Sequence, residues 1–227
     1  MNGEPRTLLI DADDTLWENN IYFERVIADF VAALGQRGHN PAQVEQLLWQ
    51  TEQRNVKTTG YGSKAFCKSL HQVARELNCA ELEPWIIEWE NWIFHHPIEF
   101  MPGVQETLPL LHAKNRLIVV TKGREDEQLG KLRRSGLEMY FHATEVVFEK
   151  SVATYQSLIT NHQLDAAATW MIGNSPRSDI NPAKTAGLHT VFIPYHTTWQ
   201  HEIEEISPNG AETLVLEHFG QLREHFG

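Results

Sequence analysis

The chain has 227 residues, with 30 acidic against 19 basic side chains and a formal net charge of −11. A surface this acidic repels phosphate backbones and anionic lipid, so we expect neither nucleic acid nor a membrane as a partner. The apolar fraction of 41% is ample for a packed core, which excludes a disordered chain. No signal-peptide pattern occurs, and no segment approaches the ~18 apolar residues that span a bilayer, so the sequence predicts a cytoplasmic protein.

The first predicted element is a short buried strand, Thr7 to Ile10, followed at once by acidic residues. Its apolar run lacks alternation, which is typical of a strand covered on both faces. Alternation along an extended chain would point Asp11 and Asp13 to the same side. Two adjacent carboxylates repel unless a metal cation stabilises them or they divide the work as nucleophile and general acid and base. Taken alone, the motif also fits an Asp-rich turn or helix cap.

From about Asn19 to His96 the pattern predicts helices only. Asn19-Asn20 is a candidate N-cap of the first, and Asn40-Pro41 opens the second. Ser63 is a candidate cap of a third, and a Trp-rich stretch forms a fourth. We interpret this bundle as a cap domain of residues 18–97, inserted into a core of residues 1–17 and 98–227.

After the turn at Pro102-Gly103, strand and helix patterns alternate along the chain. Alternation of this kind predicts a parallel sheet with helices on both faces. The predicted fold class is therefore α/β, a three-layer α/β/α Rossmann-like core with an inserted α-helical bundle. The strands are predicted at 117–120, 145–148, 169–172 and 190–193, and the helices at 123–135 and 151–161.

Polar residues at the ends of the later strands add to the first motif. Thr121, Lys122 and Gly123 end one strand and open a helix, where a hydroxyl and backbone N–H groups could bind an anion. Lys150 follows the next strand, and Asp179 follows the strand after that. Singly, Thr121 fits a helix cap and Lys150 a surface residue. Together at the carboxyl ends of parallel strands, where ligands bind, they predict phosphoryl transfer with oxygen ligands suited to Mg²⁺.

On these residues the chain resembles the haloacid dehalogenase superfamily of hydrolases, in its phosphatase branch with a helical cap after the first strand. Asp11-Ala12-Asp13-Asp14-Thr15-Leu16 is similar to the first family motif. Thr121 is similar to the second, Lys150 to the third, and Gly173-Asn174-Ser175 through Asp179 to the fourth. The resemblance covers nearly the whole chain.

The resemblance implies a role for each residue. Asp11 would attack phosphorus, and Asp13 would protonate the leaving oxygen and then activate water to hydrolyse the aspartyl-phosphate. Thr121 and Lys150 would hold the phosphoryl oxygens. Mg²⁺ would be bound by Asp11, the backbone carbonyl of Asp13 and Asp179, with Asn174, where many members have an acid, contacting the metal or a metal-bound water.

Three other functions stay open. Family dehalogenases need no metal and lack the acid two residues after the nucleophile, so the presence of Asp13 argues against carbon–halogen hydrolysis. A response-regulator receiver also combines a phosphorylatable Asp with an acid, a Thr and a Lys, but shows little turnover. The third is a protein that binds a phosphorylated metabolite with little activity. It stays open because Asn174 stands where many family members have an acid.

Substrate choice is predicted to come from the inserted helices. The segment Asn55 to Lys64 joins two of them, and Tyr61 could stack on a base or sugar there, although a plain surface loop is the alternative. The predicted substrate- and phosphate-binding residues are Thr15, Lys122, Gly123, Tyr61 and Arg177. We expect a small phosphorylated metabolite as ligand, whether nucleotide, sugar phosphate or phosphorylated acid, and a monomer or homodimer.

Overall fold

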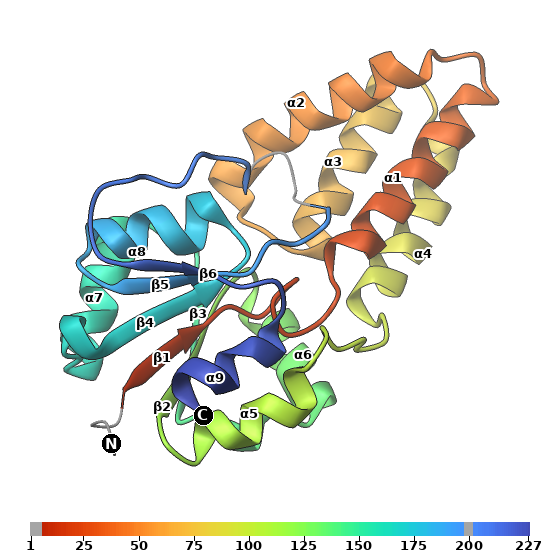
Figure 1. The fold of residues 1–227 in the computed structure, drawn as a ribbon. Coiled ribbons are helices and arrows are strands. Elements are labelled where there is room, and N and C mark those ends of the chain that lie inside the picture. Colours follow the sequence, from red (N-terminus) through yellow and green to blue (C-terminus); the bar gives the residue numbers. More distant parts are fainter. Residues whose placement is uncertain (1–5, 198–201) are drawn as a thin grey trace. The chain divides into compact units, whose positions relative to one another are not determined.

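The computed structural model describes residues 6–197 and 202–227, and its contacts divide the chain into two compact units (Figure 1). The first unit contains residues 1–20, 98–122 and 128–227. The second contains residues 21–97 together with 123–127. Each has an apolar core of its own.

The first unit is built on a six-stranded sheet in the order β3-β2-β1-β4-β5-β6, with every neighbouring pair parallel. The strand order reverses direction between β1 and β4, which is where such sheets bind ligands. The strands are β1 (Thr7–Ile10), β2 (Arg116–Lys122), β3 (Ala143–Val147), β4 (Thr169–Gly173), β5 (His189–Phe192) and β6 (Thr213–Val215). The predicted parallel α/β core is confirmed, and β6 is an addition at its edge.

Helices cover both faces of this sheet, because successive side chains of a strand point to opposite sides. Leu8 and Ile10 of β1 join a core with residues of α5 (Val104–His112), α6 (Glu125–Ser135) and α9 (Leu222–Phe226). Leu9 joins a core with α7 (Val152–His162) and α8 (Asn181–Thr185) on the other face. Figure 1 shows these two helical layers on either side of the strands. Short 3₁₀ turns complete the unit at Glu138–Tyr140, Ala166–Ala168 and Phe219–Gln221.

The second unit is a helical bundle with an apolar core drawn from four helices. These are α1 (Asn20–Gly35), α2 (Pro41–Thr59), α3 (Ser63–Glu76) and α4 (Glu83–Phe94), with a 3₁₀ turn at Ala80–Leu82. The predicted opening of α2 is confirmed: the Asn40 side chain accepts the N–H of Gln43 at 3.3 Å. None of the helices in the described ranges is long and apolar enough to cross a membrane.

Two predictions about this bundle were wrong in detail. Ser63 does not cap α3: Gly62 stands at the cap position, and the Ser63 N–H and hydroxyl donate to the Glu127 carboxylate at 3.1 and 3.0 Å. The connection between the two helices is shorter than the predicted 55–64, because α2 continues to Thr59 and only residues 60–62 separate it from α3. The helical pattern simply extends closer to the two glycines than the loop assignment assumed.

Candidate active site

The proposed nucleophile lies directly after β1, at the carboxyl edge of the sheet. Asp11 is 6% exposed, and its N–H continues the β1–β4 pairing by donating to the Ile172 carbonyl at 2.9 Å. Its carboxylate oxygens are divided between two partners. Lys150 Nζ donates to Oδ1 at 2.5 Å, and the Thr15 hydroxyl donates to Oδ2 at 3.0 Å. The carboxylate is therefore fixed in orientation before any ligand arrives.

Asp179 is brought to the same lysine by a tight turn after β4. A Cβ added to Gly173 would lie 2.2 Å from Asp179 Oδ2, so only glycine leaves room for this carboxylate at the strand end. The Ser175 N–H donates to Asp179 Oδ2 at 3.0 Å, within a π-helical turn η4 (Pro176–Ile180). Lys150 Nζ contacts Asp179 Oδ1 at 2.7 Å and so bridges the two acids.

The charge at this point is not balanced. Two buried carboxylates, Asp11 and Asp179, share the single ammonium of Lys150. Burial raises the pKa of Asp11 to about 7; Lys150 opposes the rise, and Asp179 adds to it. The pKa of Lys150 is raised in spite of its burial, because both acids favour its charged form. The cluster therefore carries excess negative charge in a place from which water is largely excluded.

Asp13 has a different environment from Asp11. Lys131 Nζ contacts both of its oxygens, at 2.6 and 2.7 Å, and the Trp17 and Gln128 side chains donate at 2.8 and 3.0 Å. Burial alone would raise the pKa of Asp13, but the charge and hydrogen bond of Lys131 hold it below its ordinary value. Asp13 is thus maintained as an anion.

The residues at the end of β2 are placed unequally. The Thr121 hydroxyl has no hydrogen-bond partner within the described ranges, although the residue is only 2% exposed. Lys122, in contrast, is engaged by the protein itself. Its Nζ donates to the Ser178 hydroxyl at 2.8 Å and to the Glu202 carboxylate at 2.6 Å.

The remaining predicted residues fall into three places. Arg177 is exposed on η4. Gly123 has a φ of 135°, a conformation that favours glycine. Gly123 and Tyr61 belong to the second unit, and their reach toward a substrate at Asp11 stays a prediction.

The donors suit a hard divalent cation, although they form no cluster of acids and histidines. Within residues 6–197 and 202–227, no three His, Cys, Asp or Glu side chains group as a metal site. Asn174 supplies another oxygen: its Oδ1 lies 3.3 Å from the Thr15 hydroxyl, which also contacts Asp11. Carboxylate and amide oxygens beside uncompensated negative charge are the surroundings that Mg²⁺ prefers.

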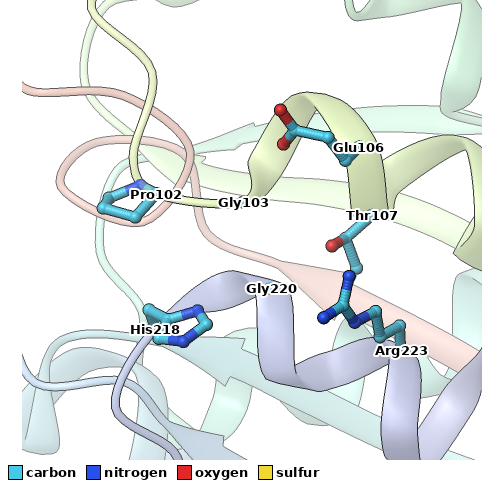
Figure 2. A pocket seen from close by; sticks show the side chains of 7 residues that line it. All are labelled: Pro102, Gly103, Glu106, Thr107, His218, Gly220 and Arg223. Atoms are coloured by element: carbon cyan, nitrogen blue, oxygen red, sulfur yellow. The ribbon is translucent and has the colours of Figure 1, made fainter.

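A surface pocket of about 350 Å³ lies elsewhere in the first unit, between the start of α5 and the start of α9 (Figure 2). His218, Arg223 and Glu106 line it, and it contains none of the predicted site residues. A Cβ at Gly103 would lie 2.6 Å from Gly220, so the close approach of these two glycines shapes the pocket floor. Its mixed charges and lack of predicted site residues set it apart from the Asp11 cluster.

Several residues that contact the site, and that are far from it along the chain, were not predicted from the sequence. Lys131 and Gln128 lie three residues apart on α6, a spacing that puts them on one helix face. That spacing was visible, but nothing in the sequence linked this face to Asp13. Ser178 and Glu202 gave no signal beyond their residue types.

Comparison with protein families matches residues 5–187 to the haloacid dehalogenase-like hydrolases. Comparison with curated proteins found no match. Among solved structures, a haloacid dehalogenase-like family hydrolase from Xanthomonas campestris is 28% identical, with a TM-score of 0.84. The alignment covers 98% of this chain and 94% of that one.

Two other solved structures share the fold at lower identity. A 2-haloacid dehalogenase from Pseudomonas syringae is 22% identical, with a TM-score of 0.65 over 97% of both chains. The hydrolase YfnB from Bacillus subtilis, whose crystals contained magnesium, is 19% identical, with a TM-score of 0.67 over 99% of both chains. Since the family match spans most of the sequence, the chain belongs to the haloacid dehalogenase-like hydrolases.

Proposed function

We propose that this hydrolase is a magnesium-dependent phosphatase acting on a small phosphate monoester through an aspartyl-phosphate on Asp11. The observation that carries the proposal is the placement of Asp11. Asp11 is a buried carboxylate of fixed orientation at the point where the strand order of the sheet reverses. It contacts the ammonium of Lys150, which could also bind phosphoryl oxygens. Thr121, a residue only 2% exposed at the carboxyl end of β2, adds a hydroxyl that could donate to a phosphoryl oxygen.

The steps follow from the contacts of these side chains. Asp11 attacks phosphorus, while Lys150 and the Thr121 hydroxyl stabilise charge on the phosphoryl oxygens. The bond from phosphorus to the ester oxygen breaks as the bond to Asp11 forms, and the leaving oxygen takes a proton from solvent water. A second water then hydrolyses the aspartyl-phosphate to free Asp11 and inorganic phosphate. Asp13, held as an anion by Lys131, is suited to accept the proton of that water. The same contacts weaken Asp13 as a proton donor to the leaving oxygen.

Mg²⁺ is part of the proposal because of the charge at Asp11. Asp11, Asp179, Asn174 and the backbone carbonyl of Asp13 are the oxygens proposed to hold it. When bound, Mg²⁺ would neutralise phosphoryl charge and polarise the reacting group. It would also relieve the repulsion between Asp11 and Asp179, which a single lysine leaves uncompensated.

The test is release of inorganic phosphate from a panel of phosphate monoesters, with Mg²⁺ and with chelator. We expect multiple turnovers by the unchanged protein and a loss of at least about 10³-fold in Asp11→Asn, since the nucleophile is gone. The matched control is Asp29→Asn, at an exposed position of α1. If Asp11→Asn kept its activity, the aspartyl-phosphate route would be refuted.

Carbon–halogen hydrolysis is the second candidate, and the Asp13–Lys131 ion pair is the observation that favours it. A halide leaves without needing a proton, so an Asp13 held as an anion does not hinder that reaction. Asp11 would then attack carbon, and water would hydrolyse the resulting ester. The presence of Asp13 remains the argument against it.

The two candidates separate in one experiment. Chloride release from 2-chloropropionate and phosphate release from monoesters are measured on the same protein, with and without chelator. Phosphate release that chelator abolishes supports the phosphatase. Chloride release that chelator leaves unchanged supports the dehalogenase. A single uptake of phosphoryl groups without turnover would instead indicate a signalling or binding protein.

A further inference from the structure

A carboxylate of the protein itself is held by one lysine and two serines beside the proposed active site. Glu202 lies in the connection between β5 and β6, and its side chain is 13% exposed. Oε1 contacts Lys122 Nζ at 2.6 Å, and Oε2 accepts hydrogen bonds from the hydroxyls of Ser175 and Ser178. The Lys122 charge and these hydrogen bonds lower the pKa of Glu202 to about 2, overcoming the opposite effect of burial.

The two hydroxyls are oriented toward an anion by contacts that do not involve Glu202. Ser175 Oγ accepts the backbone N–H of Ser178 at 2.9 Å, as the cap of η4, so its own proton points elsewhere. Ser178 Oγ accepts from Lys122 Nζ at 2.8 Å, which likewise turns its proton outward. Two aligned O–H donors and an ammonium therefore form a preorganised anion site.

This anion site adjoins the residues proposed for catalysis. The Ser175 N–H donates to Asp179 and its hydroxyl donates to Glu202, so this residue contacts both the acid cluster and the anion site. Lys122 directly follows Thr121 in β2. A group bound at this anion site would therefore lie close enough to belong to a molecule whose phosphoryl group is at Asp11.

The chemistry of the anion site favours a carboxylate over a second phosphate. Its donors serve two oxygens, one facing Lys122 and one facing the two serines, which is the shape of a carboxylate. Glu149 lies 3.6 Å from Lys122 Nζ and would repel the larger charge of a phosphate dianion.

Described residues before and after Glu202 are held by side-chain hydrogen bonds. Before it, the Thr197 carbonyl accepts from the Asn20 side chain at 2.9 Å. After it, the Glu205 carbonyl accepts from the Asn181 side chain at 2.9 Å. A carboxylate tethered in this way competes with free ligands at an effective concentration of ~1 mM or more. The carboxylate of a substrate that is held at Asp11 by its phosphoryl group would have a similar effective concentration, and it could displace the Glu202 carboxylate.

We propose that Lys122, Ser175 and Ser178 form a subsite for the carboxylate of a phosphorylated carboxylic acid, and that Glu202 fills it in the absence of substrate. The carboxylate subsite rests on these contacts alone, whereas the assignment of its ligand as a substrate rests on the proposed phosphatase function. Glu202 is then a specificity residue, because only a ligand with its own carboxylate recovers the contacts that are lost when Glu202 leaves.

The first experiment measures binding and needs no turnover. Acetate is titrated into the full chain by calorimetry, comparing the unchanged protein, Glu202→Ala and the double variant Glu202→Ala with Lys122→Met, with acetamide as the neutral control. We expect acetate to bind Glu202→Ala at least about tenfold more tightly than the unchanged protein, since the tethered competitor is gone. The double variant should lose that gain, and acetamide should not bind.

Equal acetate binding by Glu202→Ala and the unchanged protein, with matching unfolding curves, would overturn the subsite. Glu202→Gln guards against misfolding, because it keeps the size of the side chain and removes only its charge. It should show an intermediate gain in acetate affinity.

The second experiment compares 2-carboxyethyl phosphate with propyl phosphate, which lacks the carboxylate. We expect the unchanged protein to have the lower KM for the acid, Glu202→Ala to lower that KM further by about tenfold, and Lys122→Met to remove the preference. A KM ratio that does not change in either variant would overturn the substrate assignment. If neither compound is hydrolysed although other monoesters of the panel are, the substrate assignment fails; if no monoester is hydrolysed, the phosphatase proposal fails, while acetate binding still decides the subsite.

Discussion

The ion pair between Lys131 and Asp13 gives the sharpest test of how this site is held together. Lys131 has a side-chain exposure of 2% and Asp13 of 21%, and both contacts between them are shorter than 2.8 Å. Replacing Lys131 with Met keeps the length of the side chain and removes the charge. Asp13 is then left among the Trp17 and Gln128 donors, with its negative charge unpaired.

Breaking a buried pair by removing one partner costs about 3–5 kcal/mol. The partial exposure of Asp13 and its two remaining donors place Lys131→Met at the lower end, about 3 kcal/mol. For a chain of this length that corresponds to a fall in Tm of roughly 6–12 °C. Urea denaturation of the unchanged protein, Lys131→Met, Asp13→Asn and the double variant gives the coupling energy directly.

We expect the double variant to be more stable than the sum of the single effects predicts, because neither charge is then left alone. A Lys131→Met variant within about 1 kcal/mol of the unchanged protein would refute the reasoning, since that is the value of an exposed pair. So would single effects that add without coupling.

Substitutions at Gly173, Gly130 and Glu52 test three further local environments. Gly173→Ala should displace Asp179, because the new Cβ would lie 2.2 Å from Asp179 Oδ2, and calorimetry should show weakened Mg²⁺ binding. Gly130→Ala on α6 should instead stabilise the fold by about 0.5–1 kcal/mol, because its Cβ meets only Arg134 at 3.5 Å. Burial raises the pKa of Glu52 from its ordinary 4.5 to about 7, so its cost to stability is absent well below pH 4.5, grows as the pH rises from 4.5 to 7, and is constant above 7. Urea denaturation should therefore show Glu52→Gln gaining up to about 3 kcal/mol at pH 8 and almost nothing at pH 4.5, and an equal gain at both pH values would contradict this origin.

The sheet was predictable because its central strands are continuous apolar runs. Residues 8–10 of β1 and 117–120 of β2 are fully covered, and burial on both faces leaves a sequence signal. The edge strand β6 has only three residues, none of them buried, so it leaves no comparable run. Helix α5 was missed for another reason: Pro109 lies inside it and interrupts the helical pattern.

The candidate site was predictable only where it follows strand ends. Asp11, Lys150 and Asp179 meet because each follows a strand of one parallel sheet, and this rule works across 139 residues of separation. Lys131 comes from the middle of α6 and Glu202 from a long connection, where no rule specifies the direction of a side chain. Their partners depend on tertiary packing, which a single sequence does not display.

The three lysines of the site show where a cation is needed. Lys131 is matched by Asp13, and Lys122 by Glu202 with the more exposed Glu149 nearby. Only Lys150 faces two buried carboxylates, and it is there that burial and like charge raise the pKa of an acid to about 7. Because the neighbouring acids are already neutralised by their own lysines, we expect a divalent cation to gain most free energy at Asp11 and Asp179. Its binding should therefore weaken strongly in Asp179→Asn and little in Glu202→Gln, a contrast that general attraction to an acidic surface would not produce.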